Sequence, residues 1–161
     1  MTRTTPAVLV LLTAAAMVLS LSPSQADGAA AVFRHGRTWG RTIDVNAFSF
    51  GQCTWGALHK FAEATGVYPW VDGDARHWPG SAAANGWTTV EQAESRAIVL
   101  FQPGVHGAHA TGHAAWVDAV SDTAEGMVVH LTEMNGNGLA DGTWSSRTVV
   151  HSPGMSYILA P

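Results

Sequence analysis

Charged residues are scarce in this chain. They make up 12% of its 161 residues, about half of the share found in an ordinary soluble domain. Basic residues are few as well, because 8 Lys and Arg stand against 12 Asp and Glu and give a net charge of −4. A nucleic-acid-binding protein needs a basic surface for phosphate contacts. The composition therefore argues against that class, and the lack of any run of like charges excludes a polyelectrolyte tail.

Cysteine is almost absent. The one cysteine, Cys53, cannot form an intramolecular disulfide, and it cannot build a zinc site that needs several cysteines. A chain of this length can bury a hydrophobic core without covalent or metal cross-links. We therefore expect one domain whose stability rests on packing.

Long apolar runs are also missing, apart from one near the N-terminus. Ala7–Leu21 has 15 residues, fewer than the roughly 20 that a spanning helix needs, but within the range of a signal-peptide core. Arg3 precedes this run, and Ser-Gln-Ala at 24–26 supplies small residues for a signal peptidase. We expect residues 1–26 to be a signal peptide cleaved before Asp27, and the mature protein to be secreted without membrane contact. An uncleaved N-terminal anchor is the alternative.

The remaining chain divides into a lead-in and one domain. Residues 27–44 are rich in Ala, Gly and Arg and predict a flexible lead-in, and residues 45–161 predict a single domain. Apolar residues at a 3.6-residue period predict a helix that begins at Cys53 and ends at Gly66. Shorter helical turns are expected around residues 74–78 and 81–85.

The second half of the chain has the pattern of strands. Short apolar or alternating runs are separated by Pro-Gly and Asn-Gly turn signals. Strands are expected at Ala97–Phe101, His113–Val120, Met127–Glu133, Trp144–Val150 and Met155–Leu159. Helices followed by sequential strands predict an α+β fold, with N-terminal helices packed on an antiparallel sheet.

Cys53 stands at the predicted start of a helix. Exported proteins usually pair their cysteines, so an unpaired thiol is a liability unless it is buried, joined to another chain or chemically needed. The free N–H groups and the dipole of a helix start stabilise a negative charge, which lowers a thiol pKa and creates a nucleophile. A buried, inert cysteine is the alternative.

A cysteine nucleophile needs a histidine base that a third group orients. Among the 8 histidines, His113 opens a strand directly after a glycine, and a strand fixes the direction of a side chain better than a loop does. Strand alternation places His113 on one face with Ala115 and Val117, which leave room for a substrate. A histidine on the surface at a strand edge is the alternative.

Glu133 and Asn135 are the candidates for the orienting group. Alternation places both on the face that carries Val129 and Leu131, and a carboxylate that ends an apolar face usually has a partner. The two side chains stand about 7 Å apart along a strand, so both can reach one imidazole. If the strand ends earlier, both are exposed turn residues instead.

Three motifs together resemble one known family. They are Gly51-Gln52-Cys53-Thr54-Trp55, Gly112-His113-Ala114-Ala115 and Glu133-Met134-Asn135. Their order and spacing are similar to those of the CHAP domain (cysteine, histidine-dependent amidohydrolase/peptidase), and the resemblance covers roughly residues 45–160. It implies a papain-like α+β fold and a secreted or cell-wall-associated enzyme that cleaves an amide bond in bacterial peptidoglycan.

The resemblance also implies a role for each motif residue. Cys53 is the expected nucleophile, His113 the base, Glu133 the group that orients the base, and Asn135 the fourth member. The backbone N–H of Cys53, with the Gln52 side chain as a weaker candidate, is expected to stabilise the oxyanion. The cleaved bond is then that of an N-acetylmuramoyl-L-alanine amidase or of a stem or cross-bridge endopeptidase. We expect no cofactor, no metal and a monomer.

Other interpretations stay open. A metallohydrolase could use the spacing of His106, His109 and His113, although a glycine-rich loop positions such ligands poorly. A non-catalytic wall-binding or toxin-like module would bind the wall and release no product. Some members of the family bind calcium through Asp residues ahead of the cysteine; Asp44 and Asn46 lie there.

Tryptophan is abundant for so short a chain, with 7 residues. Trp39, Trp87 and Trp144 are candidates to line a groove for glycan or peptide. Burial in the core is the competing interpretation for each of them.

Overall fold

The computed structural model describes residues 1–2, 35–136 and 138–161. The predicted signal peptide, residues 1–26, falls almost entirely outside them. In chain order the elements are β1 (Thr42–Ile43), α1 (Cys53–Thr65), β2 (Tyr68–Pro69), the 3-10 helix η1 (Ala75–His77), α2 (Trp78–Ala84), β3 (Thr89–Val90), β4 (Ala97–Phe101), the 3-10 helix η2 (Val105–Gly107), β5 (His113–Thr123), β6 (Gly126–Met134), β7 (Trp144–Val150) and β8 (Met155–Leu159).

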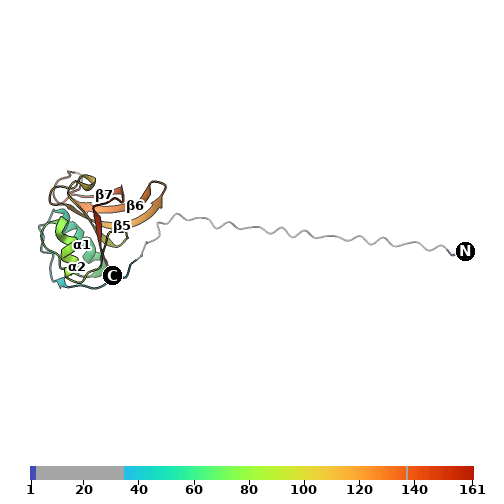
Figure 1. The fold of residues 1–161 in the computed structure, drawn as a ribbon, viewed down its shortest axis with the longest axis horizontal. Helices are drawn as coiled ribbons and strands as arrows, with labels where there is room; N and C mark the ends of the chain where they lie inside the picture. The colour runs from blue at the N-terminus through green and yellow to red at the C-terminus, as the bar shows by residue number, and fades with distance from the viewer. Residues whose placement is uncertain (3–34, 137) are drawn as a thin grey trace.

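Six of the strands form one antiparallel sheet. Its order is β3-β8-β4-β5-β6-β7, and every neighbouring pair is antiparallel. Helices α1 and α2 both contribute to the apolar cluster on one face of this sheet, and β5 and β6 form its longest hairpin (Figure 1). The α+β architecture predicted from the sequence is confirmed.

The local sequence explains the main elements. Leu58 and Phe61 are buried on one face of α1, and Gly66 ends the helix in the left-handed conformation, with its N–H donating to the carbonyl of Ala62. Strand β4 is buried along its whole length, as its unbroken apolar sequence requires at the centre of a sheet.

Apolar side chains cover both faces of the sheet. One cluster joins the helices to the sheet and includes Phe61, Trp78, Ile98 and Trp116. The other cluster, on the opposite face, joins strands β4 to β8 and includes Phe101, Val117, Leu131 and Tyr157. Neighbouring residues of β4 and β5 alternate between the two clusters, as strand geometry requires.

Two parts of the fold differ from the sequence-based expectation in detail. The two separate helical turns expected near residues 74–85 form a continuous stretch, because η1 runs directly into α2. Strands β1, β2 and β3 have only two residues each, too few to show an alternating pattern.

The described part of the predicted lead-in contacts the domain. The guanidinium of Arg37 donates to the carbonyls of Ser95 and Arg96, each at 2.8 Å. Further along, β1 pairs with β2. Within the part of the chain that the structure describes, no helix combines the length and the apolar character needed to cross a bilayer.

Candidate active site

Cys53 is the first residue of α1. Gln52 before it is extended (φ −87°, ψ 154°), and its side chain makes no capping hydrogen bond to the helix. The first turn therefore leaves N–H groups free to face an anion. The Cys53 residue is partly exposed, and the backbone N–H groups of Thr54 and Ala114 help to lower the pKa of its thiol.

His113 is held at the start of β5. It pairs with Phe101 of β4, and only 8% of its surface is exposed. Gly112 before it has φ +80°, and a Cβ there would come within 2.7 Å of the Arg76 nitrogen and 2.8 Å of the Phe101 oxygen. The glycine of the Gly-His motif is thus required both for its left-handed backbone and for this close approach.

Glu133 lies near the end of β6 and is 1% exposed. Its Oε2 lies 2.9 Å from Nε2 of His113. Since Glu133 occupies Nε2, Nδ1 is the ring nitrogen left to face the Cys53 thiol, whose pKa His113 lowers by hydrogen bonding and by charge. Thiol, imidazole and carboxylate therefore form one continuous chain, which we name the candidate triad (Cys53, His113 and Glu133).

Electrostatics within the candidate triad favour a thiolate beside an imidazolium. Burial alone would raise the pKa of Cys53, but the hydrogen bond and charge of His113 outweigh it, so the pKa lies below the ordinary thiol value. Burial would lower the pKa of His113, but its hydrogen bonds to Cys53 and Glu133 raise it to about 9. For Glu133, burial is likewise outweighed by His113 and Arg147, and the pKa of the carboxyl is lowered.

Asn135 is placed differently from the candidate triad. It adopts a left-handed backbone (φ 55°) just after β6, and its Nδ2 lies 3.4 Å from Oε1 of Gln52 rather than against His113. The Nε2 of Gln52 donates to Asp141 at 2.9 Å. The structure therefore brings three of the four expected residues into contact and places Asn135 with Gln52 on the wall of the cavity in front of them.

That cavity has a volume of about 570 Å³. Cys53 and His113 lie in its wall, together with Asn135 and the glycine-rich loop that contains His106 and His109. The volume is typical of a site for a small molecule or a peptide segment. A substrate carbonyl that enters it can reach the sulfur.

The residues of the metal-site alternatives make other contacts. Nε2 of His106 lies 2.9 Å from the carbonyl oxygen of Val150. The amide of Asn46 donates to the carbonyl of Trp55 and accepts from the Phe48 N–H. Among the described residues, no three or more His, Cys, Asp or Glu side chains are grouped so that they could hold a metal ion.

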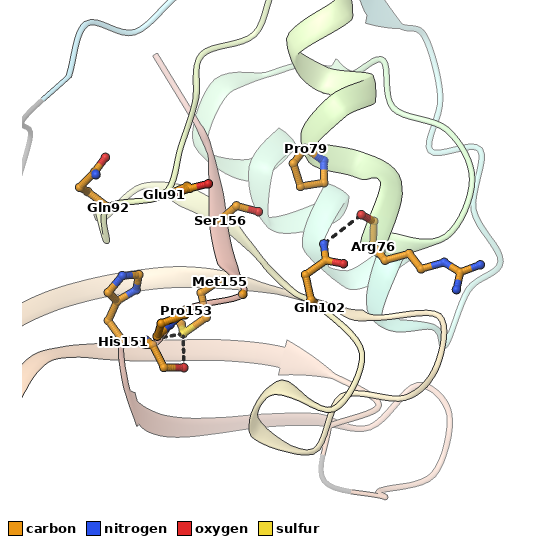
Figure 2. A pocket seen from close by; sticks show the side chains of 11 residues that line it. Arg76, Pro79, Glu91, Gln92, Gln102, His151, Pro153, Met155 and Ser156 are labelled. Carbon is orange, nitrogen blue, oxygen red and sulfur yellow. Dashed lines mark hydrogen bonds between the residues drawn. The ribbon is translucent and has the colours of Figure 1, made fainter.

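A larger cavity, of about 670 Å³, lies between the start of α2 and the start of β8 (Figure 2). Its wall includes Arg76, whose carbonyl accepts a hydrogen bond from Gln102 at 3.0 Å (Figure 2). It also includes His151, whose Nδ1 lies 2.9 Å from the hydroxyl of Tyr157. None of the described residues in its wall carries a thiol, so size alone does not identify the reactive site.

The three candidate groove tryptophans have different positions. Trp87 is 2% exposed and belongs to the core. Trp39 packs against it at a ring distance of 6.1 Å but is itself mostly exposed. Trp144 is exposed at the start of β7, and its ring lies 6.3 Å from that of His59.

Sequence reasoning missed two residues that touch the candidate triad. Arg147 of β7 places Nε 2.9 Å from Oε1 of Glu133. Gly136 lies so close to that carboxylate that a Cβ would overlap with its Oε1 and Cδ atoms. Neither residue belongs to the three motifs, and the strand register that brings Arg147 to Glu133 cannot be read from one strand alone.

Comparisons with known proteins identify the family of the chain. The profile of the CHAP domain family matches residues 43–135. The chain is 31% identical to the N-acetylmuramoyl-L-alanine amidase sle1 of Staphylococcus saprophyticus over 116 residues, which are 70% of this chain and 32% of that protein. It is 30% identical to the secretory antigen SsaA of Staphylococcus epidermidis over 117 residues, which are 73% of this chain and 41% of that protein.

The match therefore spans 32% to 41% of the length of these relatives. Among solved structures, an N-acetylmuramoyl-L-alanine amidase from Staphylococcus aureus superposes with a TM-score of 0.56 at 23% identity. The superposition covers 75% of this chain and 38% of that one. At this identity the likeness shows a shared fold.

Proposed function

The chain belongs to the CHAP domain family, and from this membership and the geometry of its site we propose that it is a secreted peptidoglycan hydrolase with a cysteine nucleophile. The observation that carries the proposal is the continuous contact from the Cys53 thiol through His113 to the buried carboxylate of Glu133. This is the arrangement of nucleophile, base and orienting group that acyl transfer needs.

The reaction begins from the ion pair, in which the proton of the Cys53 thiol already lies on His113. Glu133 stabilises the imidazolium through Nε2. The thiolate attacks the carbonyl carbon of the substrate amide, a carbon–sulfur bond forms, and the carbonyl electrons move to oxygen. The backbone N–H of Cys53 and the amide of Gln52 are the proposed donors to this oxyanion; one such donor contributes about 2.7–4 kcal/mol to the transition state.

The second half of the reaction releases both products. The tetrahedral intermediate collapses, the carbon–nitrogen bond breaks, and His113 gives its proton to the leaving amine. Water then attacks the thioester while His113 takes one of its protons. The carbon–sulfur bond breaks, the acid product leaves, and the Cys53 thiolate is restored beside the imidazolium.

The proposed substrate bond is the amide between N-acetylmuramic acid and L-alanine. The support is the name of the relatives, because both the matched Staphylococcus saprophyticus protein and the superposed structure are N-acetylmuramoyl-L-alanine amidases. An endopeptidase acting in the stem or cross-bridge would use the same chemistry.

One experiment separates these activities. Purified peptidoglycan is incubated with the protein or with Cys53→Ala, and the soluble products are analysed by mass spectrometry. An amidase releases peptides with a new L-alanine N-terminus and leaves glycan strands without peptide. An endopeptidase leaves L-alanine attached to the glycan and replaces the amidase assignment. Binding to the wall without any new amine would contradict hydrolysis and favour the non-catalytic module.

Secretion is the second part of the proposal. It is supported by the sequence pattern of residues 1–26 and by the name of the relative SsaA, a secretory antigen. We propose that the exported protein begins at Asp27 and acts at the cell wall as a monomer. N-terminal sequencing and light scattering of the protein recovered from culture medium test this; retention of residues 1–26 would contradict it.

A further inference from the structure

The buried carboxylate of Glu133 has two cationic neighbours. Oε2 faces Nε2 of His113, and Oε1 faces Nε of Arg147, each at 2.9 Å. The Arg147 side chain is 17% exposed and that of Glu133 is fully buried. In the sheet, Glu133 of β6 pairs with Ser145 of the neighbouring strand β7, and Leu131 pairs with Arg147. Arg147 is therefore the diagonal neighbour of Glu133 on the same face of the sheet.

Two further contacts hold the guanidinium in place. Its Nη1 donates to the carbonyl of His106 at 3.1 Å, in the loop that forms one wall of the cavity. Its central carbon lies 5.4 Å from the ring centre of Phe101, the residue paired with His113 in the sheet. Nε approaches Glu133 without the alignment of a hydrogen bond, so the contact acts mainly through charge.

We propose that Arg147 is a positioning residue: it keeps Glu133 ionised and directed at His113, and it ties that carboxylate to the loop of residues 104–112. Its part in hydrolysis rests on the function proposed above. Its effect on the ionisation of Cys53 does not, because that effect needs no substrate. Arg147 lies outside the segment matched by the family profile.

The direction of the effect follows from charge. Arg147 repels any proton that would be added to Cys53, His113 or Glu133, so its loss makes each of these protonations easier. The thiolate would then be protonated at a higher pH, and the pKa of Glu133 would rise because a neighbouring cation has gone. The alkylation rate of Cys53 rises with pH as the thiol loses its proton, and we call this rise the acid limb of the profile. Both changes move the acid limb towards higher pH.

Other titratable groups face this site from the surrounding elements. His106 and His109 lie on the cavity wall, and Asp141 is bonded to the Gln52 side chain. They remain in every variant below, so a shift that depends on residue 147 alone cannot come from them.

The test uses the only thiol of the chain. The rate of Cys53 alkylation by iodoacetamide is measured against pH in the wild type, Arg147→Met and Arg147→Lys. Methionine keeps an apolar stem against Phe101 but removes the charge, and we expect the acid limb to move up by about 0.5–1 pH unit. Lysine restores a cation, and we expect it to return most of this shift.

Arg76→Met is the matched control. Arg76 also bonds a carbonyl of the same loop, that of Ala110 at 3.1 Å, but the carboxylate beside it is that of Asp74, at 3.5 Å. We expect its alkylation profile to match the wild type. An Arg147→Met profile that superposes on the wild type, or an equal shift in Arg147→Lys and Arg147→Met, would overturn the charge role of Arg147. If Arg147→Met does not melt cooperatively, Arg147→Gln, neutral and polar, takes its place with the same expected shift.

Hydrolysis assays on the same variants separate the two proposals. If the wild type releases no wall products while Arg147→Met shifts the alkylation profile, the proposed function fails and the role of Arg147 stands. If the wild type hydrolyses peptidoglycan but Arg147→Met leaves the alkylation profile unchanged, the proposed function stands and the role of Arg147 fails. When both proposals hold, Arg147→Met loses most activity on the acid side and regains part of it at higher pH.

Discussion

Two glutamates in this molecule are buried between a histidine and an arginine. Glu133 lies between His113 and Arg147, and Glu94 between His35 and Arg37. Both carboxylates are almost completely inaccessible to solvent. We name the second set (His35, Arg37 and Glu94) the N-terminal clamp.

The two sets differ in what lies beyond the histidine. His113 has the Cys53 thiol and a cavity beyond it, whereas the His35 side chain is 38% exposed. In the N-terminal clamp, Arg37 also donates to backbone carbonyls, including that of Ala160 just after β8, and so holds the segment before β1 against the end of β8. A buried Glu–His–Arg arrangement by itself therefore stabilises the fold. It can take part in a reaction only where a nucleophile and space for a substrate lie next to the histidine.

The largest expected effect on activity comes from removing the Cys53 sulfur. Cys53→Ala removes the atom that forms the acyl-enzyme, and we expect the rate of peptidoglycan hydrolysis to fall by about 10⁴-fold or more. The measurement is product release by the purified variant, with its melting temperature as the control for folding. Wild-type rates in this variant would contradict a cysteine mechanism.

Glu133→Gln tests the orienting carboxylate. The amide has nearly the same shape but no charge, so the imidazolium loses its stabilising partner, and we expect kcat/KM to fall by about 10²–10⁴-fold. The same change in the N-terminal clamp, Glu94→Gln, is the matched control. Equal losses of activity in the two variants would remove the distinction between the two sets.

Gly136→Ala tests whether the position of the Glu133 carboxylate matters, and it leaves every charge in place. The new methyl group would overlap with the Glu133 carboxylate, and a displacement of about 1 Å at a reacting centre can cost up to about 100-fold in rate. Gly80→Ala in α2 is the control, because no atom other than those of its chain neighbours and its own helix backbone lies within 4 Å of its Cβ position. Turnover and melting temperature of both variants decide the outcome; an active Gly136→Ala would show that the carboxylate tolerates movement.

The pH profile tests the ionic form of the candidate triad. The reactive form needs Cys53 deprotonated and His113 protonated. Because the pKa of His113 is raised to about 9 and that of Cys53 is lowered, we expect a plateau whose alkaline limb begins near pH 9. Above it the rate should fall as the imidazolium is lost. A limb near the ordinary histidine value of about 6.5 would contradict the stabilising role of Glu133.

Glu94→Gln has the smallest expected effect on activity and a clear one on stability. It removes the negative charge beside the Arg37 guanidinium in a buried site, which costs on the order of 3 kcal/mol. We expect a lower urea midpoint and an unchanged kcat/KM for the folded protein. A loss of activity without a loss of stability would place the N-terminal clamp in the reaction.

Much of the site could be predicted from the sequence because its signals are local. The helix begins at Cys53 as predicted, and β4, β7 and β8 have the expected bounds. These positions follow from apolar period and turn residues, which short segments carry by themselves. The closeness of the Cys53, His113 and Glu133 motifs was expected from the family resemblance rather than from any spacing rule.

The parts that could not be predicted depend on strand register and on packing between distant segments. Arg147 has the pattern of a polar residue on an alternating strand, and only its pairing with Leu131 brings it to Glu133. Gly136 resembles any turn glycine until the carboxylate beside it is located. The lead-in has no apolar period, and Arg37 is held by carbonyls about 58 or more residues away.

The most direct test is a titration of the single thiol. The ultraviolet absorbance of the Cys53 thiolate is followed against pH in the wild type and in His113→Gln, with Cys53→Ser as the blank. We expect the wild-type midpoint to lie below the ordinary cysteine value of about 8.5 and the His113→Gln midpoint to lie at or above it. A wild-type midpoint at or above that value, unchanged by His113→Gln, would contradict the thiolate–imidazolium pair.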